Sequence, residues 1–112
     1  MKKEIDGRED IYLENLQLEQ KVREDLKVYD ILYLQGPAGW GKYTFLKNYK
    51  NHTERTVIWI ETAEDIEQQT HPFPEECVVI IPKLELLVQE EVQEWLWNRI
   101  REKKRRQKFL IA

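Results

Sequence analysis

The hydrophobic positions of this chain form two patterns, short continuous runs and wider helical spacings. Four short runs are mostly apolar, and the first and third are apolar on successive residues, which is typical of parallel strands that are covered on both faces. They lie at residues 31–35, 56–60, 77–81 and 108–112. Each run predicts a β-strand, and the one at 56–60 is also rich in the β-branched and aromatic residues that favour strands.

Helical spacings of apolar residues fill the intervals between the runs. Three longer helices are predicted, at residues 15–28, 42–50 and 89–103. Asn15 can cap the first, and its Leu18, Val22 and Leu26 share one face. The third has the most regular face, made of Val92, Trp95, Leu96 and Ile100. A shorter helix is predicted from Thr62, which can cap it, to about Gln69. Strands that alternate with helices predict βαβ units, and hence an α/β fold with a parallel sheet.

The segment that joins the first strand to the next helix is rich in glycine. It comprises Gly36, Pro37, Ala38, Gly39, Trp40, Gly41, Lys42, Tyr43 and Thr44. A strand, a glycine-rich turn, a lysine and a helix form, in this order, a phosphate-binding loop, in which backbone N–H groups and the helix dipole attract an anion. Lys42 is expected to add a positive charge at the β- and γ-phosphates. We therefore predict a nucleotide site at 36–44; the alternative is a glycine-rich turn without a ligand.

One position of this loop departs from the usual pattern. Ser or Thr normally follows the lysine, and its hydroxyl holds Mg²⁺. Here Tyr43 takes that position, and its rigid ring cannot place an oxygen where a short hydroxyl would lie. Thr44 comes one residue later, about 100° further round the helix. The sequence therefore predicts phosphate binding but assigns no metal ligand.

The stretch 35–42, Gln-Gly-Pro-Ala-Gly-Trp-Gly-Lys, resembles the loop of the large ATP-binding transcription regulators of the LuxR class. These are the maltose-regulon-activator-like members of the signal-transduction ATPases with numerous domains. The likeness covers residues 11–61 and resumes at 77–112. It implies ATP or ADP as the ligand, the remaining domains of a larger parent protein as partners, and DNA binding only through a downstream domain that this sequence does not contain.

The resemblance also implies the architecture. We expect a P-loop NTPase-like three-layer sandwich with about four parallel strands, in the order second, third, fourth, first. Such sheets usually continue with a fifth strand beyond the first, and the sequence ends at Ala112 inside the fourth predicted strand. Residues 1–112 are therefore expected to form a single, partial nucleotide-binding domain, with a loose N-terminus at 1–10.

In the ATPase class that this chain resembles, the third strand ends in two acids that support Mg²⁺ and polarise the attacking water. The corresponding residues here are Pro82, which has no ligand atom, and Lys83, which has the opposite charge. Glu85 could substitute for a missing acid, but the simpler interpretation is an exposed side chain. No catalytic residue and no metal site is assigned, Mg²⁺ is doubtful as a cofactor, and we expect nucleotide binding with little or no hydrolysis. The alternative function is a degenerate scaffold that acts as an interaction module without a nucleotide.

Composition and cysteine content bound the class of protein. Apolar residues make up 41% of the chain and charged residues 35%, which fits a globular protein with a charged surface. The sequence contains no apolar run near membrane-spanning length and no signal peptide at its start, so no membrane contact is expected. The single cysteine, Cys77, excludes an internal disulfide and makes the cytoplasm the expected location.

The remaining chemistry-bearing residues have simpler explanations. Residues 99–108 hold seven basic residues and one acid, which could bind nucleic acid but are expected to form the solvated end of a helix. His52 and His71 lack partners at metal-ligand spacing and are expected on the surface. Cys77 is expected to be a small buried residue. Trp40 could stack on a base or pack outside the turn.

Overall fold

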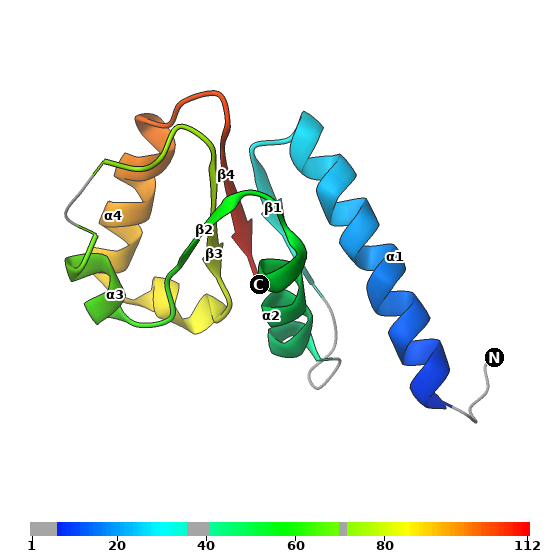
Figure 1. Cartoon of the computed structure of the whole chain (residues 1–112). Helices are drawn as coiled ribbons and strands as arrows, with labels where there is room; N and C mark the ends of the chain where they lie inside the picture. The colour runs from blue at the N-terminus through cyan, green and yellow to red at the C-terminus, as the bar shows by residue number, and fades with distance from the viewer. Residues whose placement is uncertain (1–6, 36–40, 70–71) are drawn as a thin grey trace.

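The computed structural model describes residues 7–35, 41–69 and 72–112. Helices and strands alternate along the described chain, with one 3-10 helix, η1, before the last α-helix (Figure 1). The elements are α1 Gly7–Val28, β1 Ile31–Tyr33, α2 Lys42–His52, β2 Thr56–Trp59, α3 Ala63–Glu67, β3 Cys77–Ile81, η1 Leu84–Val88, α4 Glu90–Arg101 and β4 Gln107–Ile111. None of the helices in these ranges is long and apolar enough to cross a membrane.

The described strands form one parallel sheet in the order β1-β4-β3-β2. This confirms the α/β fold class and the expected strand order. Val79 in β3 is aligned with Ile58 in β2 and with Phe109 in β4. Every residue of β3 and β4 is buried, because these two strands have a neighbour on each side and helices on both faces.

The helices divide between the two faces of the sheet, which gives three layers. Figure 1 shows α3 and α4 on one face and α1 and α2 on the other. Successive strand residues point to opposite faces, so each face has its own core. The core beneath α4 includes Ile58, Val79, Ile81, Val92, Leu96 and Phe109. The core beneath α1 and α2 includes Val22, Leu26, Phe45, Leu46, Tyr49, Val78, Ile80 and Leu110.

Strand β1 contradicts the expectation that it is covered on both faces. Leu32 packs against the core beneath α1 and α2, whereas Ile31 and Tyr33 are 43% and 48% exposed. Of the described strands only β4 pairs with β1, and no described helix buries these two side chains. A run of apolar residues predicts a strand but does not show whether a helix lies over each of its faces.

The first helix is longer than its apolar spacing predicts. It begins at Gly7, so Asn15 lies inside it rather than capping it, and residues 7–10 are helical rather than loose. Residues 1–6 lie outside the described residues. The predicted face of this helix is confirmed, because Val22 and Leu26 are buried in the core. The first residues of the helix are mostly polar, and polar residues give no apolar spacing from which the start of a helix can be predicted.

The basic block at 99–108 differs from the solvated helix end that was expected. Helix α4 ends at Arg101, and two later lysines form ion pairs with Asp30. Lys103 Nζ lies 3.1 Å from one Asp30 oxygen, and Lys108 Nζ lies 3.0 Å from the other. Hydrogen bonds from Lys108 and Lys103 lower the pKa of Asp30. These contacts fix the start of β4 against the residue that precedes β1.

Candidate phosphate-binding site

Helix α2 begins at the glycine that ends the predicted phosphate-binding loop. Gly41 is the residue before the helix and has φ 90° and ψ 28°, in the left-handed region. Glycine adopts this conformation without the strain that a Cβ would cause. The Gly41 carbonyl accepts the first helical hydrogen bond, from Phe45 N at 2.9 Å. The predicted site residues Gly36, Pro37, Ala38, Gly39 and Trp40 lie outside the described residues.

The first turn of α2 holds the remaining predicted site residues, Lys42, Tyr43 and Thr44. Lys42 is half-buried, and no hydrogen bond or ion pair joins its ammonium group to another described residue. Thr44 is exposed. The turn contains no acid. Backbone N–H groups at a helix start attract anions, and an amino group without a partner beside them adds to that attraction.

Tyr43 points instead to the end of the neighbouring strand β2. Its hydroxyl lies 3.0 and 3.1 Å from the two carboxylate oxygens of Glu61. The indole N–H of Trp59 donates to the same carboxylate at 2.9 Å, and the Lys83 ammonium lies 3.4 Å from it. Glu61 thus joins α2, the end of β2 and the end of β3. We call Tyr43, Trp59, Glu61 and Lys83 the Glu61 cluster.

The charge state of Glu61 follows from these neighbours. The Trp59 hydrogen bond is the largest influence lowering the pKa of Glu61, burial opposes it, and Tyr43 and Lys83 add to the lowering. Donors that bind the charged form of a carboxyl lower its pKa. Glu61 is therefore an anion at neutral pH, and the Lys83 ammonium is its closest cation in the cluster.

Ammonium groups also lie over the aromatic rings of the Glu61 cluster. Lys47 Nζ lies 5.4 Å from the Tyr43 ring centre and 5.0 Å from that of Trp59. Lys83 Nζ lies 6.0 Å from the Tyr43 ring centre. The two rings meet edge to face with centres 5.8 Å apart. Cations within about 6 Å of an aromatic face are attracted to it, so the rings hold positive charge beside the start of α2.

The residues that follow β3 make one contact that the sequence did not predict. Pro82 is buried, and Glu85 is exposed without a hydrogen bond to another described residue. Lys83 turns toward Glu61. The carboxyl ends of parallel strands share one edge of the sheet, so Glu61 and Lys83 could have been recognised as neighbours from their positions after β2 and β3.

The chemistry of this edge does not fit the Mg²⁺ ion that a phosphate-binding loop usually holds. Mg²⁺ needs oxygen ligands in octahedral geometry. Tyr43 directs its hydroxyl to Glu61, and the Glu61 carboxylate is occupied by two donors and an ammonium. Among the described residues, no three His, Cys, Asp or Glu side chains are grouped to hold a metal.

Cys77 and His52, which the sequence also singled out, lie away from this edge. Cys77 is fully buried at the start of β3, as expected, and burial raises the pKa of its thiol to about 11. His52 is exposed, but its Nδ1 lies 3.0 Å from Glu19. His71 lies outside the described residues.

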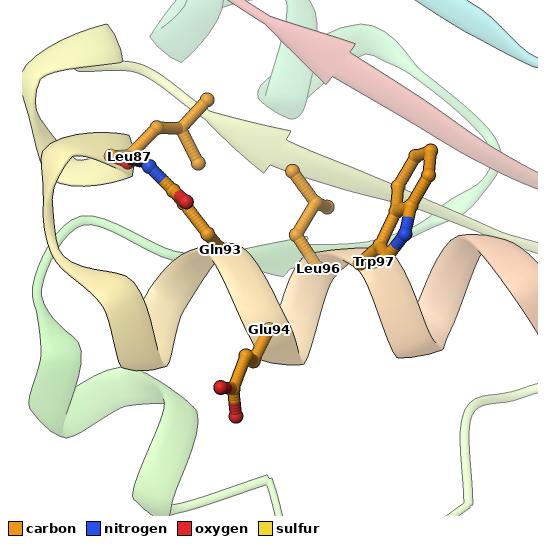
Figure 2. A pocket seen from close by; sticks show the side chains of 5 residues that line it. All are labelled: Leu87, Gln93, Glu94, Leu96 and Trp97. Carbon is orange, nitrogen blue, oxygen red and sulfur yellow. Dashed lines mark hydrogen bonds between the residues drawn. The ribbon is translucent and has the colours of Figure 1, made fainter.

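A separate groove of about 500 Å³ lies between η1 and α4. Its lining residues are Leu87, Gln93, Glu94, Leu96 and Trp97. Figure 2 shows Leu96 and Trp97 on the side of α4 that is turned toward the strands and Glu94 on the opposite side. Trp97 is 62% exposed. The groove contains none of the predicted site residues.

Comparisons with protein-family models, with curated proteins and with solved structures gave no match.

Proposed function

We propose that this chain is the nucleotide-binding part of a LuxR-class transcription regulator and binds ATP or ADP through residues 36–44. The observation that carries the proposal is the start of α2. A glycine in the left-handed conformation precedes the helix, no acid lies in its first turn, and Lys42 has no partner among the described residues. This start lies at the carboxyl edge of a parallel sheet, where ligands bind in open α/β folds.

The same edge argues against rapid phosphoryl transfer. Such transfer depends on metal ions, lysine and arginine groups to stabilise the charge that moves, and on a residue that orients the nucleophile. Tyr43, Pro82 and Lys83 replace the residues that would hold the metal and the water. We therefore propose a domain that binds and senses a nucleotide and hydrolyses it at a rate near background.

Calorimetric titration with ADP and with ATP tests this function. Lys42→Ala should weaken binding by about 1–3 kcal/mol, because it removes a charged hydrogen-bond donor to the phosphates. Lys104→Ala is the matched control, since it removes the same charge from an exposed position in the connection before β4. Steady phosphate release by the wild type, or equal affinities for wild type and Lys42→Ala, would contradict the proposal.

The second candidate is a scaffold that binds a partner and no nucleotide. The groove between η1 and α4 favours it, because its lining includes Leu87, Leu96 and Trp97, and Trp97 is 62% exposed. Large apolar side chains that gather at the surface often mark a contact site. A wild-type chain that binds neither nucleotide would support this candidate.

A further inference from the structure

We propose that the Lys83 ammonium occupies the role of the missing metal, so that the ligand of this site is a metal-free nucleoside di- or triphosphate. The inference rests on the proposed function and names the form in which the nucleotide is bound. It starts from two of the three positions where the chain departs from the usual phosphate-binding pattern, Tyr43 and Lys83. The structure joins these two positions through Glu61.

The first step is the position of Lys83. It follows β3, and its Nζ lies 6.0 Å from the ring centre of Tyr43, which is the residue after Lys42 in the first turn of α2. Its side chain is 54% exposed, so the ammonium is open to a ligand. Glu61 and the Tyr43 ring hold the ammonium at this edge rather than leaving it free in solvent.

The second step is the charge of the edge. Lys42, Lys47 and Lys83 place three ammonium groups around the start of α2, and the Glu61 carboxylate offsets one of them. A net positive charge remains for the phosphates without a divalent ion. An added Mg²⁺ would be repelled by Lys83 and would find the Glu61 oxygens already bound. A fixed cation and a bound metal are therefore alternatives at this edge.

The third step is that the unusual residues at positions 43 and 83 depend on each other through Glu61. Lysine after β3 alone would add a second ammonium over the Tyr43 ring, where Lys47 already lies, and Glu61 relieves the repulsion between them. Tyr43 binds the same carboxylate and keeps it in place, which a short Ser or Thr side chain at that position could not do. The Lys83 ammonium is thus positioned by Glu61, and Glu61 is positioned by Tyr43.

The test is calorimetry with ADP and ATP, in EDTA and in Mg²⁺. The wild type should bind with affinities that differ by less than about threefold between the two conditions. Lys83→Ala should bind about tenfold more weakly in EDTA, the scale of one charged hydrogen bond. Lys83→Arg should keep most of the affinity. Thermal unfolding confirms that each variant folds, which is expected because Lys83 is exposed.

A double variant separates two roles of Lys83. Lys83→Ala with Glu61→Gln removes both charges, so the net charge of the edge equals that of the wild type. Continued weak binding would support a direct role of the ammonium. Recovery of wild-type affinity would show that Lys83 only neutralises Glu61, and it would overturn the inference.

The remaining outcomes distinguish the inference from the proposed function. A wild type whose affinity rises more than about tenfold with Mg²⁺ would overturn the inference and leave nucleotide binding in place. Binding that depends on Lys42 but not on Lys83 would do the same. A wild type that binds no nucleotide in either condition would overturn the proposed function and the inference together.

Discussion

The carboxylate of Glu61 receives three donors, of which Trp59 is two residues away and the other two are distant in the sequence. Tyr43 lies before it, at the start of α2, and Lys83 lies after it, beyond β3. Glu61 thus joins side chains from the start of α2 and from beyond β3, although it belongs to no recognised motif.

Glu61→Gln should lower stability by about 1 kcal/mol at neutral pH, the scale of one net intramolecular hydrogen bond. The pKa of Glu61 is lowered in the folded state, so its charge favours folding above the pKa of the unfolded chain. That contribution is lost as the pH falls through the folded-state pKa. Urea denaturation of wild type and variant should therefore show a gap that closes in acid.

Asp30 also has a lowered pKa, but it is present in both proteins, so its contribution cancels in the comparison. Tyr43→Phe is the control for the hydroxyl, because it removes a donor and leaves the Glu61 charge. A gap between wild type and Glu61→Gln that is constant with pH would contradict the assigned pKa direction.

The sequence alone identified Tyr43 and Lys83 as departures from the phosphate-binding pattern, but it did not predict their common partner. Each departs from the residue type that the pattern requires at its own position. Their link to Glu61 is a tertiary contact between segments that follow different strands, and no local spacing encodes it. It could be found only by asking which residues share the carboxyl edge of a parallel sheet.

At the scale of elements, the apolar side chains of helix α4 that are spaced to share one face are the ones that pack against the core. Val92 and Leu96 are buried, and Trp95 packs against the same core and meets Phe73 edge to face at 5.9 Å between ring centres. Trp97 lies off this face and lines the groove beside η1. The two tryptophans are two residues apart and have different surroundings.

Trp95→Ala should therefore cost about 3 kcal/mol of unfolding free energy, from lost burial and the cavity that remains. Trp97→Ala should cost less than about 1 kcal/mol, as is usual for exposed positions. Paired urea denaturation curves measure both changes, and each variant serves as the control for the other. Equal losses would mean that the face of α4 is misassigned.

Periodicity predicted the type and the inner face of the long helices because both follow from local spacing. It did not predict that one face of β1 is exposed, because the cover of a strand depends on where distant helices pack. It also failed for the lysines beyond α4, whose partner Asp30 is more than 70 positions earlier in the chain. Contacts of this kind depend on the topology and not on the local sequence.

At the scale of the whole molecule, the sheet places its central strands out of reach of solvent. β3 and β4 are buried along their entire length, and Cys77 begins β3 between Thr56 of β2 and Gln107 of β4. A reagent can meet this sulfur only when the strands separate. The thiol is thus attached to the part of the sheet whose opening requires disruption of both cores.

The rate at which Cys77 is modified can therefore report how often the fold opens. At pH 8, a disulfide reagent should modify it far more slowly than it modifies a peptide thiol, at a rate set by the equilibrium population of the open state. A variant that is destabilised by about 3 kcal/mol, such as Trp95→Ala, should react about a hundredfold faster. Modification of the native wild type at the rate of a free thiol would show that β3 separates from its neighbours without unfolding of the whole sheet.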